Sequence, residues 1–238
     1  MEAIEIEMEL DVDNLYTFPL TSTRYVRRVA KKAMSQVNYR FVKEQLPDYE
    51  IYKMLREAFR GGNTHANRYY TNYTLHNVHS ADRSSSYPDV MCNCKFPISE
   101  FYRLGDIGYE EVVKMIGKRQ KACLMRVAIS GLHLTRIDWG CPYLSLSKCR
   151  HIENALEDNG RILSADYLET TVTDIDLKII LQEYSFTDIK FYDVATARYG
   201  YLPEPLIKTI CQYYHYKTEL KNVPGKELLY MKSKNKLN

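Results

Sequence analysis

One short segment combines a carboxylate, a serine-rich turn and an aromatic ring, and it runs from Asp82 to Pro88 as DRSSSYP. Asp82 offers a ligand to a divalent cation such as Mg²⁺, which prefers one or two carboxylates together with phosphate oxygens. Tyr87 offers a flat ring that leaves no room for a ribose 2′-hydroxyl. The segment is therefore a candidate site for a metal ion and a deoxynucleotide, whereas its residue types alone favour a turn with a packed tyrosine.

Two other acidic segments are candidates for metal binding. Residues 4–11 alternate apolar and acidic side chains, which favours the solvated face of a strand over a metal site. Asp174 and Asp176 follow Thr173 and precede an apolar run of helical period. This pattern favours an N-capped helix start over a metal site.

Cysteine and histidine spacing gives weaker signals. Cys92 and Cys94 are too close for a standard zinc half-site, and Cys141, Cys149 and His151 lack a fourth ligand at typical spacing, so free thiols are favoured. Three histidines are interpreted as surface turn residues, with phosphate contact as the alternative: His65, His76 and His79. Neither GxxxxGK[ST] nor GxSxG occurs, so P-loop hydrolysis and α/β-hydrolase chemistry lack support.

Length and composition exclude several classes of protein. The 238 residues are 45% apolar and 26% charged, which is ordinary for a folded globular chain. No uncharged apolar run is long enough to span a membrane, and the first residues are acidic where a signal peptide is basic. The six cysteines contain no CxxC pair and indicate reduced thiols. We therefore expect a cytoplasmic protein without a disulfide scaffold.

Charge is distributed unevenly along the chain, although the net charge is only +3. Residues 24–43 carry seven bases and no acid, and residues 208–238 carry seven lysines against two glutamates. Two such blocks indicate a polyanionic partner, whereas solvation of helix faces is an equally good explanation of either block alone. The 21 tyrosines add rings that can stack on nucleotide bases or pack a core.

Periodicity predicts a mixture of helices and strands. Helices are expected at residues 24–43, after an N-cap in Thr21–Thr23, and at 49–58, 109–118, 174–184, 203–221 and 225–238. Strands are expected at 4–10, before Asp82, at 121–130, in short pieces over 132–152, and at 188–195. Because no regular strand–helix–strand rhythm appears, the predicted fold class is α+β: a small antiparallel sheet with flanking helices and a C-terminal helical hairpin.

Three motifs in order resemble family B DNA polymerases of the phage and prophage, protein-primed-like branch. The segment DRSSSYP resembles motif A, DxxSxYP, although Ser86 stands where leucine is usual. Upstream, Phe59 to Gly62 resembles the (Y/F)xGG element, and Lys234 to Asn238 resembles the opening of motif B, KxxxNSxYG. The resemblance also extends to residues 21–28 and 159–184, and so covers most of the chain.

The resemblance implies a role for each matched residue. Asp82 is expected to be catalytic and to bind the first of two Mg²⁺ ions, and Tyr87 to exclude ribonucleotides. Ser85, Lys234 and, by a looser match, Lys217 are expected to bind the triphosphate, with Asn238 near the nascent base pair. The template strand is expected to bind Phe59, Arg60, Gly61 and Gly62.

The resemblance also implies the domain layout and the partners. Residues 1–58 correspond to a linker with basic helices after an exonuclease domain, 59–202 to a partial palm with an insertion, and 203–238 to the fingers. The expected activity is template-directed DNA synthesis on primer-template DNA with dNTPs. The second metal-binding aspartate of the family belongs to YxDTDS, which does not occur here, so the two-metal site is incomplete and this chain alone is expected to extend no primer. The alternatives are a non-catalytic nucleic-acid-binding remnant and one piece of a polymerase completed by a separately encoded chain.

Overall fold

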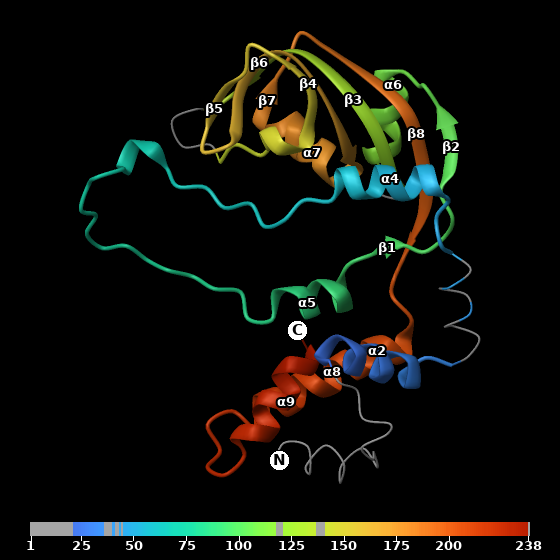
Figure 1. The fold of residues 1–238 in the computed structure, drawn as a ribbon, viewed down its shortest axis with the longest axis vertical. Helices are drawn as coiled ribbons and strands as arrows, with labels where there is room; N and C mark the ends of the chain where they lie inside the picture. The colour runs from blue at the N-terminus through green and yellow to red at the C-terminus, as the bar shows by residue number, and fades with distance from the viewer. Residues whose placement is uncertain are drawn as a thin grey trace. The chain divides into compact units, whose positions relative to one another are not determined.

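The computed structural model describes residues 21–35, 40, 43, 45–117, 121–136 and 141–237. The chain forms two compact units, each built from separate stretches of sequence (Figure 1). We call one the helical unit, made of 1–44, 82–96 and 200–238, and the other the sheet unit, made of 45–81 and 97–199. The strand expected at residues 4–10 and the site residue Asn238 lie outside the described residues.

The sheet is antiparallel, with the strand order β1-β8-β3-β6-β4, while β2 pairs with β8, β5 with β6 and β7 with β3. Its strands are β1 (Phe96–Pro97), β2 (Tyr102–Gly105), β3 (Lys121–Leu134), β4 (Cys149–Glu153), β5 (Leu156–Asp158), β6 (Arg161–Thr173), β7 (Tyr184–Ser185) and β8 (Asp188–Gly200). The helices of the sheet unit are α4 (Tyr49–Ala58), α6 (Tyr109–Gly117) and α7 (Asp174–Glu183), with short 3₁₀ turns at Arg68–Tyr70 and Leu146–Lys148. This arrangement confirms the predicted α+β class.

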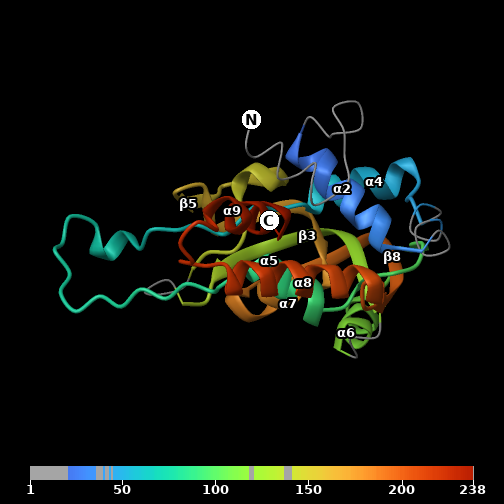
Figure 2. The same ribbon diagram turned by 90° about the horizontal axis from the view of Figure 1, so that it is seen from below.

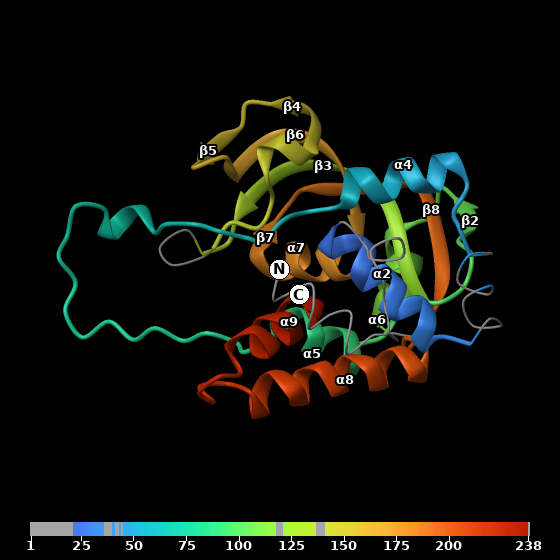
Figure 3. The same cartoon turned by 60° about the horizontal axis from the view of Figure 1, so that its bottom comes forward.

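The central strand β3 is buried on both faces, because helices pack against each of them (Figure 3). Cys123, Met125 and Val127 share a core with residues of α6 and α7. Leu124 points to the opposite face, where it packs with Ile51, Met54 and Ala58 of α4. Since side chains alternate across a strand, one near-continuous apolar run serves both layers.

Gly131 interrupts this alternation within β3. Its φ of +60° lies in the left-handed region, and the core-facing positions change from odd numbers, ending at Ile129, to even numbers, beginning at Leu132. A Cβ at Gly131 would lie 2.6 Å from Thr187 Oγ1, which itself donates to the Ser130 carbonyl. The strand therefore requires glycine at this position for two separate reasons.

Gly131→Ala is accordingly expected to lower the free energy of unfolding by about 2–4 kcal/mol, the sum of a positive-φ penalty and a steric clash. Urea unfolding followed by circular dichroism measures the change. Gly160→Ala is the matched control, because Gly160 also has a positive φ, +73°, but open space where its Cβ would be. A cost at Gly131 no larger than at Gly160 would show that the contact with Thr187 has no energetic effect.

The helical unit contains α2 (Ser22–Ala33), α5 (Ser86–Asn93), α8 (Glu204–Glu219) and α9 (Glu227–Leu237). Helices α8 and α9 pack together as the predicted C-terminal hairpin, and α2 and α5 also contact α8 (Figure 2). Thr21 caps α2 as expected, because its hydroxyl accepts from the Arg24 amide at 3.2 Å. The helix expected to continue to residue 43 instead ends at Ala33, where Met34 has an extended backbone with ψ of 135°. Most of residues 36–44 lie outside the described residues.

Two sequence expectations about strands differ from the structure. Asp82 does not follow a strand: residues 78–83 are irregular and lead through a turn at Ser84 and Ser85 into α5. The reason is local, because a stretch of serine and charged side chains has no apolar alternation to pack against a sheet. Conversely, β6 was not predicted, although it is 13 residues long, because its polar side chains at 164, 166, 169 and 170 obscure the period.

Candidate functional site

The N-terminal turn of α5 presents the motif A-like residues. Ser85 occupies the left-handed region with φ of 50°, and Pro88 lies in the first helical turn, where its missing N–H leaves no helical hydrogen bond unmade. Asp89 is held by Arg83 and by the Asn93 amide, which donates to it at 2.7 Å. These contacts join the turn to the helix, and Ser85 lies at the N-cap position of α5.

Lys217 of α8 contacts Ser85 directly, across 132 positions of sequence. The Lys217 ammonium Nζ donates to Ser85 Oγ at 2.7 Å and lies 5.9 Å from the centre of the Tyr214 ring. Ser85 and Tyr214 also line a hollow of about 290 Å³ between α5 and α8. Two residues expected to bind the same phosphate group are therefore neighbours within the helical unit.

The other predicted residues of the helical unit are placed as follows. Asp82 is exposed, and Tyr87, in the first turn of α5, is 82% exposed. Lys234 lies in α9 and is partly buried. Within the described residues there is no group of three or more His, Cys, Asp and Glu side chains that could hold a metal ion. A lone carboxylate at Asp82 fits a magnesium ion shared with nucleotide phosphates and does not fit a complete two-ion site.

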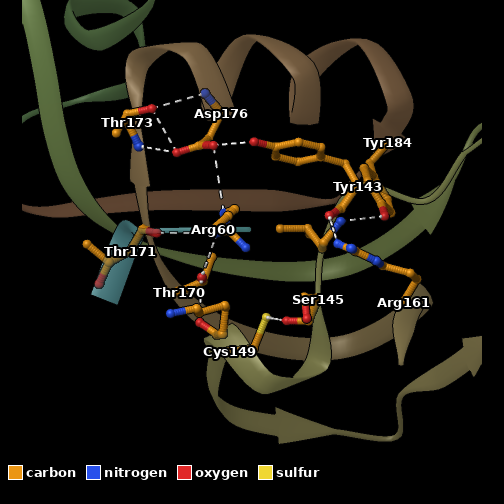
Figure 4. Close-up of polar contacts among 12 residues, drawn as sticks. Arg60, Tyr143, Ser145, Cys149, Arg161, Thr170, Thr171, Thr173, Asp176 and Tyr184 are labelled. Atoms are coloured by element: carbon orange, nitrogen blue, oxygen red, sulfur yellow. Dashed lines mark hydrogen bonds and ion pairs between the residues drawn. The ribbon is translucent and has the colours of Figure 1, made fainter. Parts of the chain in front are cut away.

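Arg60, the second residue of the (Y/F)xGG-like element, is buried inside the sheet unit (Figure 4). Its Nη2 donates to Thr170 Oγ1 and to the Thr171 carbonyl of β6, both at 3.3 Å. Its Nε lies 3.7 Å from Asp176 Oδ1, and its guanidinium carbon lies 5.7 Å from the centre of the Tyr143 ring. Arg60 thus connects the segment after α4 with both β6 and α7.

Asp176 is the centre of this network, and it caps α7 as the sequence predicts. Its Oδ2 accepts from the Thr173 amide at 2.7 Å, while Thr173 Oγ1 accepts from the Asp176 amide, which completes a capping box. The Tyr143 hydroxyl donates to Oδ1 of the same carboxylate. Burial, followed by this hydrogen bond, raises the pKa of Tyr143 well above its usual range.

Gly61 and Gly62 follow Arg60 at the surface of the sheet unit. A Cβ at either position would meet no atom within 4 Å, and neither glycine has a positive φ. Phe59, before Arg60, is 69% exposed. The part of the chain that the structure describes therefore does not require glycine at these two positions, in contrast to Gly131.

Sequence reasoning missed a second polar cluster in the sheet unit. Glu57 of α4 accepts from Arg150 and from the Thr171 hydroxyl, and it lies 3.6 Å from Arg126. Arg126 also donates to Asp193 at 2.5 Å, and a hollow of about 380 Å³ opens over these strands. The signal available in the sequence was Arg126, a charged residue within the apolar run of β3, together with Arg150 in β4. Neither position by itself reveals the partner of the arginine.

No family model matches the sequence, and no curated protein matches it either. Several solved structures, in contrast, are similar to it in fold. The chain is similar over its whole length to phi29 DNA polymerase bound to primer-template DNA, with a TM-score of 0.68 and 16% identity, and it covers 37% of that chain. The structure titled as phi29 DNA polymerase with single-stranded DNA gives 0.69 and 14%, and a ternary complex with incoming nucleotide gives 0.68 and 15%.

This likeness shows a family B polymerase-like fold. The chain spans little more than a third of the length of the polymerases that it resembles. None of the described helices is both long and apolar enough to cross a membrane.

Proposed function

We propose that the chain is part of a phage-type family B DNA polymerase and binds the incoming deoxynucleoside triphosphate between α5 and α8. The observation that carries the proposal is the hydrogen bond of 2.7 Å between Lys217 and Ser85. The Lys217 ammonium and the hydroxyl of Ser85, at the N-cap of α5, supply the positive charge and the hydrogen-bond donors that phosphate oxygens need. The likeness of fold to polymerases bound to DNA and nucleotides supports the same assignment.

Each remaining residue of the helical unit has a role in this proposal. Asp82 holds a Mg²⁺ ion together with the triphosphate oxygens, and the ion neutralises phosphate charge when it is bound. The exposed ring of Tyr87 lies under the sugar and rejects the 2′-hydroxyl by steric exclusion. Lys234 adds a second cation to the triphosphate. The nucleotidyl transfer itself requires a second metal-binding carboxylate, so the isolated chain is expected to bind without incorporating.

Gly61 and Gly62 are proposed to contact the template strand through their backbone. The support is the resemblance of this segment to the (Y/F)xGG element. No atom of the described residues lies within 4 Å of a Cβ placed at either glycine, so the backbone is open to a partner. Phe59 is exposed beside them, whereas Arg60 holds the segment in place through its contacts with β6 and Asp176. Arg60 is thus a positioning residue in this proposal, and the glycine backbone approaches the DNA.

The double variant Gly61→Ala/Gly62→Ala is expected to weaken primer-template binding by about tenfold without lowering stability, because alanine restricts the unfolded chain and meets no folded neighbour. Fluorescence anisotropy with labelled DNA measures the affinity, and urea unfolding measures the stability. The control Gly160→Ala changes a turn glycine elsewhere in the sheet unit that also has open space at its Cβ position. Unchanged DNA affinity in the double variant would remove these glycines from the interface.

Binding of primer-template DNA with and without the next complementary dNTP tests the proposed function, using a 3′-dideoxy primer and Mg²⁺. We expect salt-sensitive DNA binding that the complementary dNTP strengthens more than a mismatched one. Asp82→Ala is expected to abolish the dNTP effect and to leave DNA binding intact. If the complementary dNTP does not change the DNA affinity of the unaltered chain, the result would favour a non-catalytic nucleic-acid-binding remnant instead.

An assay with an extendable primer distinguishes a complete enzyme from one piece of a split polymerase. Incorporation that is lost on Asp82→Ala would contradict the proposed need for a second carboxylate from elsewhere. Incorporation that appears only when a second polypeptide with the YxDTDS element is added would identify that polypeptide as the separately encoded remainder.

A further inference from the structure

Two cysteines from different helices lie side by side in the helical unit. Cys92 Sγ in α5 and Cys211 Sγ in α8 are 3.9 Å apart, although 119 positions separate them in sequence. Both line the hollow of about 290 Å³ that also contains Ser85. A disulfide requires the two sulfurs to approach further, to about 2.05 Å. The helices α5 and α8, which carry the two cysteines, already pack against each other.

The two thiols differ in environment. Cys211 is exposed, whereas Cys92 is partly buried. Burial, the contact with Cys211 and the nearby Asp89 carboxylate raise the pKa of Cys92 to about 11. Cys211 is therefore the thiol more accessible to an oxidant in solution. The neighbouring thiol of Cys92 is protonated at neutral pH, because its pKa is raised.

A shared metal ion explains the pair less well than a covalent bond does. Soft ions such as zinc take four ligands in structural sites. The described residues contain no group of three or more potential ligands, here or elsewhere. Cys94 lies two residues beyond Cys92, at the C-cap of α5, and is exposed.

We propose that Cys92 and Cys211 form a reversible disulfide when the protein meets a peroxide. The Cys211 thiolate attacks one peroxide oxygen and the O–O bond breaks, which leaves a sulfenic acid on Cys211 and releases water after protonation. The Cys92 sulfur then attacks the Cys211 sulfur, its proton joins the departing hydroxide as water, and the S–S bond forms. Two thiols are oxidised and one peroxide is reduced to two waters. The bond ties α5 to α8, the two helices that carry Ser85 and Lys217.

Peptide mapping of the full-length chain after hydrogen peroxide treatment tests the proposal. Trypsin releases residues 84–95, SSSYPDVMCNCK, and residues 209–217, TICQYYHYK, as short peptides. Because the first contains both Cys92 and Cys94, the experiment is done in a Cys94→Ser background. We expect these two peptides joined in a monomer, at about tenfold or more over any other cysteine pair, and separated by dithiothreitol.

Cys92→Ser and Cys211→Ser are each expected to abolish the linked peptide, whereas Cys141→Ser, which changes an exposed cysteine of the sheet unit, leaves it. Circular dichroism confirms that each serine variant is folded. Loss of the link in the Cys94→Ser background, a disulfide-linked dimer, or oxidation of Cys211 to sulfinic acid without a link would each overturn the proposal. None of these readouts depends on nucleotide binding, so the test is independent of the proposed function.

Discussion

Replacing Asp176 with alanine is expected to lower the free energy of unfolding by about 3–5 kcal/mol, the usual cost of removing one partner from a buried ion pair. Asp176 is only 7% exposed. The variant loses the acceptor for Tyr143 and for the Thr173 amide, and it leaves the buried guanidinium of Arg60 without its carboxylate. We expect the unpaired guanidinium of Arg60 to move toward solvent, so that residues 60–62 lose their contacts with β6 and α7.

Urea unfolding of the full chain measures this effect, and two further variants assign it. Asp176→Asn keeps a side-chain acceptor for the Thr173 amide but removes the charge, so an intermediate cost is expected. Asp188→Ala removes an exposed carboxylate that lies 3.9 Å from Lys190, and it is expected to cost less than about 1 kcal/mol. A cost at Asp176 as small as at Asp188 would mean that the Arg60 network does not stabilise the sheet unit.

The contrast between Asp176 and Arg60 shows what the sequence can reveal. The cap at Asp176 was predictable, because the partner, Thr173, lies three positions away and the apolar run begins immediately after it. Helix α4 was likewise predicted with its observed bounds, since Gly61 and Gly62 follow it, and the structure adds a cap at Asp48. Arg60 could not be placed, because its partners, Tyr143, Thr170 and Asp176, are more than 80 positions away and only the assembled sheet brings them to it.

The same distinction holds for the strands and for the nucleotide-binding site. The strand β3 was predicted because its residues are almost all apolar, while β6, which pairs with it over most of its length, was hidden by the threonine, serine and acidic side chains within its sequence. The strand expected before Asp82 was wrong, since that expectation followed the function proposed for the carboxylate and no apolar pattern supports it. The proximity of Ser85 and Lys217 was expected only from the resemblance, because nothing in either segment specifies the other.

Lys217→Ala is expected to weaken binding of a deoxynucleoside triphosphate to the full chain by about tenfold to a hundredfold. The estimate follows from losing one charge-assisted hydrogen bond to phosphate, worth about 1.5–3 kcal/mol. In the unliganded chain the Lys217 ammonium donates to Ser85 Oγ, and Ser85 lines the hollow. Lys217 is therefore already held beside Ser85, and little ordering is needed when phosphate arrives. Isothermal titration calorimetry with dNTP and Mg²⁺ measures the affinity, and unfolding of the variant is expected to change by less than about 1 kcal/mol.

Lys208→Ala is the matched control, since Lys208 is a lysine of the same helix that pairs with Glu204 at 2.7 Å in solvent. It changes the net charge by the same amount, but its ion pair is with Glu204 and not with a residue that lines the hollow, so triphosphate affinity is expected to stay within about twofold because exposed charges are screened. Equal losses in both variants would mean that the protein attracts phosphate only through its overall charge. No loss at Lys217 would place the triphosphate elsewhere, and the hydrogen bond to Ser85 would then stabilise only the packing of α5 on α8.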